Sequence, residues 1–141
     1  MINLLDYAIQ HCGVPYRWAG NNPLTGFDCS GFVQWLLRSV GLDPPGRQTS
    51  QTLYDHFEAT SERNSFTLGA LAFYGKSVRE VAHVAMLLDE YQVVEAGGGD
   101  HLTLTLEDAA AKDACVRIVL LNGRPDLVAI LKPRYGTIGC I

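Results

Sequence analysis

The hydrophobic pattern of this 141-residue chain changes its period about halfway along. In the first half, apolar residues recur three and four positions apart, which is typical of amphipathic helices. In the second half, short runs rich in Val, Leu and Ile are bounded by Gly, Asp, Asn and Pro, which is typical of strands. Helices followed by antiparallel strands predict an α+β fold, with the helices gathered on one side of a β-sheet.

The first expected helix has Asn3 as its N-cap and stops at Gly13. Its buried face is expected to consist of apolar residues at helical spacing, namely Leu5, Ala8, Ile9 and Cys12. The other expected helices are Cys29–Val40, Ser50–Glu58 and Thr105–Lys112. The expected strands are Ala70–Tyr74, His83–Leu88, Tyr91–Ala96, Val116–Leu121 and Leu127–Leu131.

Composition limits what a chain of this kind can be. With 48% hydrophobic residues, the 141 residues can bury one core, so we expect a single domain over residues 1–141. No apolar run approaches the roughly 20 residues that span a bilayer, and the N-terminus lacks the pattern of a signal peptide. We therefore expect synthesis in the cytoplasm and no membrane insertion. A net charge of −4, with thinly spread Lys and Arg, argues against a nucleic-acid partner.

The cysteines indicate neither a disulfide framework nor a metal site. They lie far apart, at Cys12, Cys29, Cys115 and Cys140, and no two form a Cys-x-x-Cys pair. Reduced thiols are the expectation, and we expect no metal and no cofactor. The pattern assigns no role to Cys12, Cys115 or Cys140.

One apolar stripe places a cysteine at the first turn of a helix. Free backbone N–H groups and the positive end of the helix dipole there favour a thiolate, the form of cysteine that attacks carbonyl groups. Two interpretations of Cys29 follow: it is the first core residue of its helix, or it is an activated nucleophile. The stripe continues from Cys29 at helical spacing through Phe32, Val33, Leu36, Leu37 and Val40.

The sequence around Cys29 resembles the signature of the NlpC/P60 family of cysteine peptidases. The most specific match is the block Asp28–Gly31, with the sequence Asp-Cys-Ser-Gly. Further matching segments follow the family's order between Tyr16 and Glu95, namely Tyr16–Gly20, Arg47–Gln51, Leu68–Phe73 and His83–Leu88. The resemblance implies a papain-like fold, in which the helix of the nucleophile packs against a sheet that carries a histidine. In that arrangement both interpretations of Cys29 hold together.

The resemblance also implies a catalytic triad in which Cys29 is the nucleophile, His83 the base and Glu95 the group that orients the base. The family usually has a histidine, or another polar side chain, at the position of Glu95. A carboxylate there can accept the imidazole N–H and stabilise the imidazolium. The structural alternatives are a polar residue at a strand edge for His83 and an exposed charge at a strand end for Glu95.

The other three histidines are not the first choice for the catalytic base. His11 lies off the apolar stripe of its helix, so we expect it at the solvated surface. His56 has no apparent partner and is expected to be structural. His101 follows a loop of three glycines whose position the sequence does not fix, so it is kept as a reserve candidate for the base.

The length of one loop decides whether Glu95 can reach His83. A two-residue hairpin loop would place the two side chains on opposite faces of the sheet. A three-residue loop or a bulge would instead pair Ala85 with Glu95 and leave His83 diagonal to Glu95 on the same face. We therefore predict an odd-length loop around Asp89–Tyr91.

Substrate contacts are implied by the resemblance at Tyr16, Asp28 and Ser30. Tyr16 offers a phenol that can orient the scissile carbonyl, and Asp28 offers a carboxylate that can pair with a free peptide amine. The structural alternative for Asp28 is to cap the following helix, and both roles can hold together. The backbone N–H of Cys29 is the expected oxyanion donor.

Three alanines depart from the family's pattern. Ala19 stands where a second glycine is common, Ala70 replaces the usual aspartate of a Gly-Asp-Leu strand, and Ala85 replaces the usual glycine after the histidine and valine. None of these changes removes a catalytic group. The missing aspartate is expected to loosen a loop near the site or to alter the choice of substrate.

The resemblance implies a thiol hydrolase that cleaves an amide bond in peptidoglycan stem peptides, between the side-chain carboxyl of D-glutamate and a diamino acid. Without a signal peptide, such a domain needs delivery by a phage tail, a lysis component or a secretion apparatus, whose parts would be its partners. Two alternatives stand beside this reading. One is a thiol amidase or acyltransferase with another substrate, and the other is a degenerate structural component of a phage tail.

Overall fold

The computed structural model describes residues 3–136, so Cys140 lies outside the described residues. Four α-helices and one 3-10 helix lie within this part of the chain. They are α1 (Leu4–Gln10), α2 (Cys29–Ser39), α3 (Ser50–Phe57), α4 (Leu106–Lys112) and η1 (Leu121–Gly123). The strands are β1 (Asn21–Asn22), β2 (Gly26–Phe27), β3 (Glu62–Arg63), β4 (Leu71–Ser77), β5 (Glu80–Leu87), β6 (Gln92–Gly97), β7 (Cys115–Leu120) and β8 (Leu127–Lys132).

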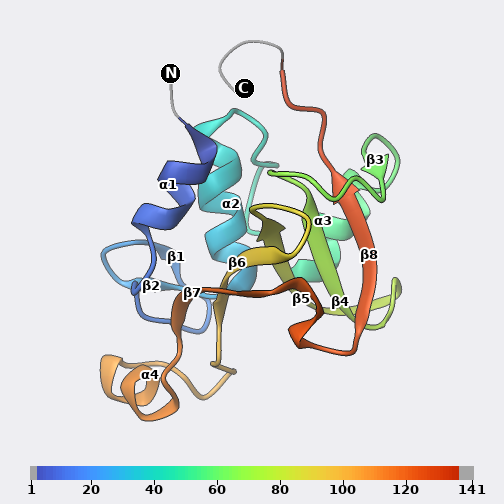
Figure 1. Cartoon of the computed structure of the whole chain (residues 1–141). Helices are drawn as coiled ribbons and strands as arrows, with labels where there is room; N and C mark the ends of the chain where they lie inside the picture. The colour runs from blue at the N-terminus through green and yellow to red at the C-terminus, as the bar shows by residue number, and fades with distance from the viewer. Residues whose placement is uncertain (1–2, 137–141) are drawn as a thin grey trace.

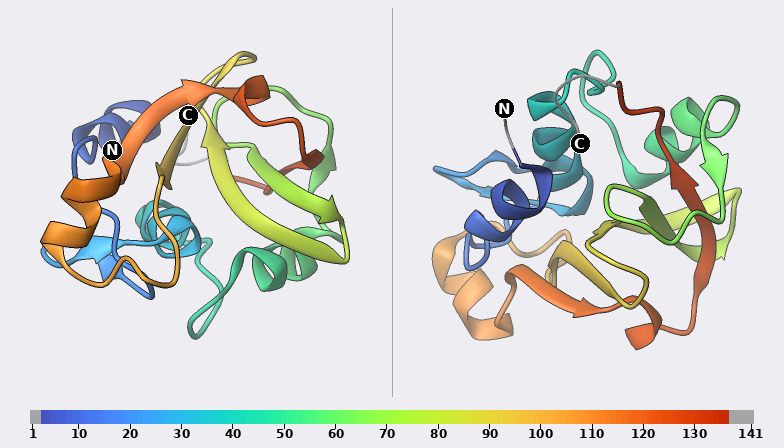
Figure 2. Two further views of the ribbon diagram at one scale, coloured as in Figure 1. Left: turned by 90° about the horizontal axis from the view of Figure 1, so that it is seen from below. Right: turned by 45° about the horizontal axis from the view of Figure 1, so that its top comes forward.

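Six of the strands form one antiparallel sheet in the order β3-β8-β4-β5-β6-β7, and β1 and β2 form a separate pair. Figure 1 shows α1 and α2 next to each other on one side of the molecule. In the left view of Figure 2, α2 and α3 lie on the same side of the curved sheet. This arrangement confirms the α+β fold expected from the change of period.

Each of the five predicted strands is present, with ends shifted by up to three residues. Two strands shift by three residues: β4 ends at Ser77, and β5 begins at Glu80, so that His83 lies within the strand and not at its head. The sequence pattern did not predict β1, β2 or β3, because strands of two residues are too short to show a period.

Helix α2 joins the two halves of the fold. Its residues Phe32, Val33, Leu36 and Leu37 are completely buried, as the apolar stripe predicted. The helix packs against β5 and β6. Since burying each large apolar side chain contributes about 1.5–3 kcal/mol, this interface holds the start of α2 firmly against the two strands that carry His83 and Glu95.

The predicted buried face of α1 is wrong in part. Leu4 and Ala8 are buried, whereas Ile9 is 42% exposed and Cys12 is exposed. The helix ends at Gln10, before the predicted stop at Gly13. The buried face of the helix therefore consists of Leu4, Ala8 and, one turn further on, His11.

That histidine, His11, is 8% exposed and not at the solvated surface as predicted. Its Nδ1 donates to the carbonyl oxygen of Tyr7 at 2.7 Å, and its Nε2 accepts from Nε1 of Trp35 at 3.1 Å. A buried polar ring is tolerated when both its nitrogens have partners. The Trp35 partner lies on α2, 24 positions away, and a pattern search within one helix cannot find it.

Candidate active site

Cys29 is the first residue of α2, and the residues around it fix where that helix begins. Asp28 is the N-cap, and its Oδ1 accepts from the backbone N–H of Gly31 at 2.8 Å. A side chain at position 31 would collide with the carbonyl oxygen of Gly20, so this turn can pack against the preceding loop only with glycine there. Cys29 itself is partly exposed, as a nucleophile must be.

His83 reaches Cys29 from the neighbouring strand. His83 is 8% exposed, and its imidazole lies close enough to Cys29 for the two side chains to interact. Its Nε2 lies 2.8 Å from Oε1 of Glu95, which leaves Nδ1 for the thiol. The three side chains expected to form a triad are thus brought together, with His83 between Cys29 and Glu95.

The loop between β5 and β6 has the predicted odd length. Leu87 pairs with Val93, and the N–H of Leu88 donates to the carbonyl oxygen of Gln92 at 2.9 Å. Three residues, Asp89–Tyr91, are left to form the turn. The same register places Glu95 opposite Ala85, so His83 is diagonal to Glu95 on one face of the sheet.

Glu95 is 4% exposed and has partners on both carboxylate oxygens. Oε1 contacts His83, and Oε2 accepts from Nε of Arg117 at 3.0 Å. Burial by itself would raise the pKa of Glu95, but the hydrogen bonds and charges of His83 and Arg117 outweigh it and lower that pKa. The carboxylate is therefore ionised at neutral pH.

The same network controls the charge of His83. Burial favours the neutral imidazole, but the hydrogen bonds from Cys29 and Glu95 favour the imidazolium more strongly and raise the pKa of His83 from 6.5 to about 9. The imidazole is therefore mostly protonated at neutral pH. An imidazolium bonded to Cys29 is the partner that stabilises a thiolate.

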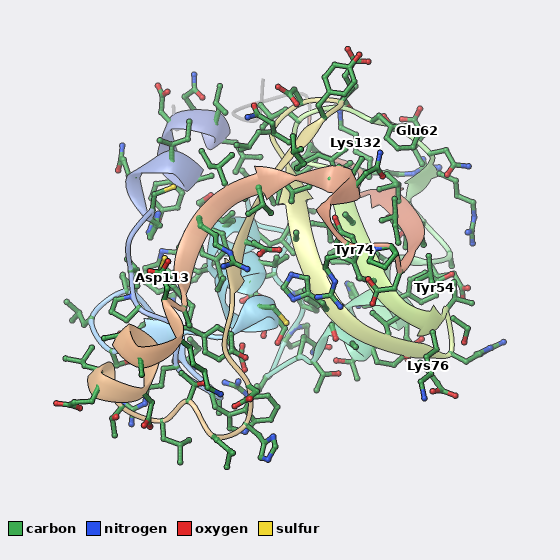
Figure 3. All side chains as sticks on the ribbon, turned by 60° about the horizontal axis from the view of Figure 1, so that its bottom comes forward. Tyr54, Glu62, Tyr74, Lys76, Asp113 and Lys132 are labelled. Atoms are coloured by element: carbon green, nitrogen blue, oxygen red, sulfur yellow. The ribbon has the colours of Figure 1, made fainter. Side chains whose placement is uncertain are left out.

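Tyr74 supports the imidazole from β4. It is paired with His83 in the sheet register, and the two ring centroids are 5.7 Å apart. The Tyr74 hydroxyl donates to the carbonyl oxygen of Leu121 at 2.8 Å. Figure 3 shows the Tyr74 side chain over β4, close to the chain that links β7 to β8. Burial first, and then the negative charge of Glu95, raise the pKa of Tyr74 to about 12, so its phenol stays a donor.

Cys29, His83 and Glu95 open into a cleft of about 590 Å³. Tyr16, Asp28 and Ser30 line this cleft beside Cys29. Tyr16 is 5% exposed, and burial, followed by the charges of Cys29 and Asp28, raises its pKa, so that it is a neutral donor. The residues implied as substrate contacts therefore lie on the wall of the cleft, next to Cys29.

Asp28 is more heavily engaged than the sequence indicated. Besides capping α2, its Oδ1 accepts from the Ser30 hydroxyl at 3.3 Å. Its Oδ2 accepts from the N–H of Ala19 at 3.1 Å and from Nη2 of Arg47 at 2.8 Å. Any substrate amine at Asp28 would have to share a carboxylate that already joins three segments of the protein.

The sequence profile of the NlpC/P60 family matches residues 13–118, well over half of the chain. The chain belongs to the NlpC/P60 family. It is 38% identical over 85 residues to the bifunctional muramidase/DL-endopeptidase CwlT of Bacillus subtilis (strain 168), covering 59% of this chain and 25% of CwlT. It is 30% identical over 93 residues to the murein DD-endopeptidase MepH of Escherichia coli (strain K12), covering 65% of this chain and 34% of MepH. The chain thus spans well under half the length of these relatives.

Solved NlpC/P60 structures share the fold over nearly the whole chain. The NlpC/p60 domain of the peptidoglycan hydrolase SagA superposes with a TM-score of 0.66 at 23% identity, covering 92% of this chain and 95% of that domain. The P60 domain of antigen MAP1204 from M. avium subspecies paratuberculosis gives 0.65 at 24% identity, covering 94% and 96%. These likenesses establish a papain-like NlpC/P60 fold.

The three departures from the NlpC/P60 pattern have distinct surroundings. Ala70 and Ala85 are completely buried in a second apolar cluster together with Leu87 and Val93. An aspartate at position 70 would therefore need a polar partner within that cluster. Ala19 is different, because it has φ of 63°, the left-handed conformation that glycine adopts most easily.

Two arginines at the site were not predicted. Arg47 lies in a segment that matches the family, but its pairing with Asp28 across 19 positions carries no periodic signal. Arg117 lies on β7, which is separated from β6 by α4 and its flanking loops, so the register that sets it opposite Glu95 cannot be read from the sequence. The available clue was that Arg117 is the single charged residue in the otherwise apolar strand predicted over Val116–Leu121.

The other histidines lie apart from the group formed by Cys29, His83 and Glu95. His101 lines the cleft and makes an edge contact with Trp18, with ring centroids 6.2 Å apart. His56 lies on α3 against Phe57. Within residues 3–136, no group of three or more His, Cys, Asp or Glu side chains is placed to hold a metal ion. No helix in this part of the chain is long and apolar enough to cross a bilayer.

Proposed function

We propose that this chain is a cysteine peptidase that hydrolyses an amide bond in the peptide stems of peptidoglycan. The observation that carries the proposal is the placement of Cys29, His83 and Glu95 side by side in one cleft, with His83 bound to Glu95 at 2.8 Å. The names of two relatives, a DL-endopeptidase and a murein DD-endopeptidase, support peptidoglycan as the substrate class.

In the first half of the reaction, the Cys29 thiolate attacks the scissile carbonyl carbon and forms a C–S bond. The carbonyl oxygen becomes an oxyanion, which the N–H of Cys29, at the positive end of α2, can stabilise. Tyr16, held neutral in the cleft wall, offers a second donor. The His83 imidazolium then gives its proton to the leaving nitrogen, the C–N bond breaks, and a thioester remains.

In the second half, His83 is neutral and acts as a base. It takes a proton from water, the hydroxide oxygen attacks the thioester carbonyl, and the C–S bond breaks. The products are a carboxylic acid and the restored Cys29 thiolate with the His83 imidazolium. Glu95 keeps the imidazole oriented in both steps and stabilises its charged form.

The scissile bond that we propose joins the side-chain carboxyl of D-glutamate to the diamino acid. Asp28 and Ser30 lie on the cleft wall next to Cys29, where they can contact the stem peptide on the acyl side. The two relatives are named for different bonds, a DL and a DD linkage. The digestion experiment below decides between the two linkages.

Digestion of purified peptidoglycan tests this proposal. The wild-type protein should release one set of fragments that end in D-glutamate and another set that begin with a diamino acid whose amine is free, identified by mass spectrometry. Cys29→Ala should release none, whereas Cys12→Ala, which removes an exposed thiol elsewhere, should behave as the wild type. Fragments from Cys29→Ala at the wild-type rate would reject Cys29 as the nucleophile. Cleavage of simple amides but not of peptidoglycan would favour the amidase or acyltransferase alternative.

A further inference from the structure

Arg117 and Glu95 face each other across two neighbouring strands. They form a register pair between β7 and β6, and Nε of Arg117 donates to Oε2 of Glu95 at 3.0 Å. The Glu95 side chain is 5% exposed and that of Arg117 is 40% exposed. Arg117 therefore lies between the buried Glu95 carboxylate and the solvent, on the side of the carboxylate that faces away from His83.

The backbone beside this pair leaves room for it. A side chain at position 97 would collide with Oε2 of Glu95 and approach Nη2 of Arg117 to 3.0 Å. Gly98 has φ of +85°, and a side chain there would lie 3.3 Å from Nη1 of the same arginine. Glycines at the end of β6 thus permit a contact that larger residues would disrupt.

We propose that Arg117 is a positioning residue, which fixes the Glu95 carboxylate in place and keeps it ionised so that Glu95 can orient His83. This inference rests on the proposed function, because it extends the triad by one residue. Arg117 acts through Glu95 and need not touch the substrate.

Two physical effects give Arg117 this role. A carboxylate held through both oxygens cannot rotate away from the imidazole, whereas one held only by His83 can. The positive guanidinium of Arg117 also partly cancels the electrostatic attraction of the Glu95 carboxylate for the proton on His83. Because a nearby positive charge disfavours a second one, Arg117 keeps His83 from holding its proton too tightly to release it to a leaving group.

The test measures the titration of His83 by NMR on histidine-labelled protein, which needs no substrate. Arg117→Gln should move the His83 titration to higher pH, and Arg117→Lys should move it less, since lysine keeps the charge but loses the fixed fork of donors. In a Glu95→Gln background the further change Arg117→Gln should have a much smaller effect, since the two residues act as one unit.

Arg124→Gln provides the matched control. Arg124 also lines the cleft, but its guanidinium is bound by Asp126 at 2.8 and 2.9 Å and not by Glu95. Its removal should shift His83 less than Arg117→Gln. A His83 titration that is unchanged in Arg117→Gln overturns the proposal, whereas a shift to lower pH would mean that the lost orientation of Glu95 outweighs the lost positive charge. If Arg117→Gln fails to fold, the Arg117→Lys titration decides by the same criterion.

Peptidoglycan digestion adds the second readout. Arg117→Gln should lower kcat about tenfold with little change in KM, since general base catalysis contributes roughly 10²–10⁴-fold and only part of it is lost. A rise in KM at unchanged kcat would instead mark Arg117 as a substrate contact and contradict the proposal. Should the wild-type protein cleave no peptidoglycan, the proposed function fails, while the NMR titration still decides the role of Arg117.

Discussion

At the scale of single residues, the site depends on how His83 is placed among its neighbours. Its imidazolium lies beside Cys29 on one side and beside the Glu95 carboxylate on the other, and Glu95 in turn binds the Arg117 guanidinium. Glu95 is almost completely buried, which costs free energy for an ionised carboxylate. The positive charges of His83 and Arg117 on either side of it offset that cost. Glu95 stabilises the His83 imidazolium, and Arg117 keeps Glu95 ionised.

Ala19 gives a prediction at the same scale. Its φ of 63° costs an L-residue roughly 1–2 kcal/mol, whereas glycine gives up about 0.5–1 kcal/mol of backbone entropy on folding. Ala19→Gly should therefore stabilise the protein by about 0.5 kcal/mol, measured by urea unfolding. Ala110→Gly is the control, because Ala110 lies in α4 and its replacement should destabilise by about 1 kcal/mol. A loss of stability in Ala19→Gly would contradict this account.

At the scale of elements, the loop between β5 and β6 sets the register of the site. Asp89 shapes this loop, since its Oδ1 accepts from the N–H groups of Tyr91 and Gln92, each at 2.8 Å. Asp89→Ala should therefore destabilise the protein by about 1 kcal/mol, the usual net value of such hydrogen bonds, as measured by urea unfolding.

Two variants of the same loop sharpen this prediction. Glu90→Ala changes an exposed neighbour and should stay within about 0.5 kcal/mol of the wild type. Asp89→Asn keeps an oxygen acceptor and should recover part of the loss. If Asp89→Ala and Glu90→Ala had equal effects, the side chain of Asp89 would not be what holds the turn.

The elements also show where sequence reasoning succeeds. Patterns confined to one element or one hairpin were predicted, as for the buried face of α2 and the odd-length loop. Contacts between distant elements were not: His11 is buried because Trp35 of α2 satisfies it, and Arg117 meets Glu95 through a register that α4 interrupts. The period of the hydrophobic pattern and the length of a loop determine local geometry. Contacts between side chains 20 or more positions apart depend on the complete fold.

At the scale of the whole molecule, the site couples protonation to stability, because His83 bonds to Glu95 and so links β5 to β6, while it also faces Cys29 at the start of α2. The pKa of His83 is raised from 6.5 to about 9 in the folded protein. Its contribution to the free energy of unfolding is therefore fully present below pH 6.5 and is lost as the pH rises through about 9. The pKa of Glu95 is lowered, so its contribution is lost as the pH falls through the acid range.

These signs predict that the wild-type protein loses stability between pH 6.5 and 9, measured as the urea midpoint across that window. His83→Gln removes the titrating group, so its urea midpoint should vary much less over the same window even if the variant is less stable throughout. His56→Gln, which removes an exposed histidine of α3, should keep the wild-type dependence. An equally steep loss of stability in His83→Gln would mean that another group governs the alkaline limb, and that the imidazolium adds little to holding α2 against the sheet.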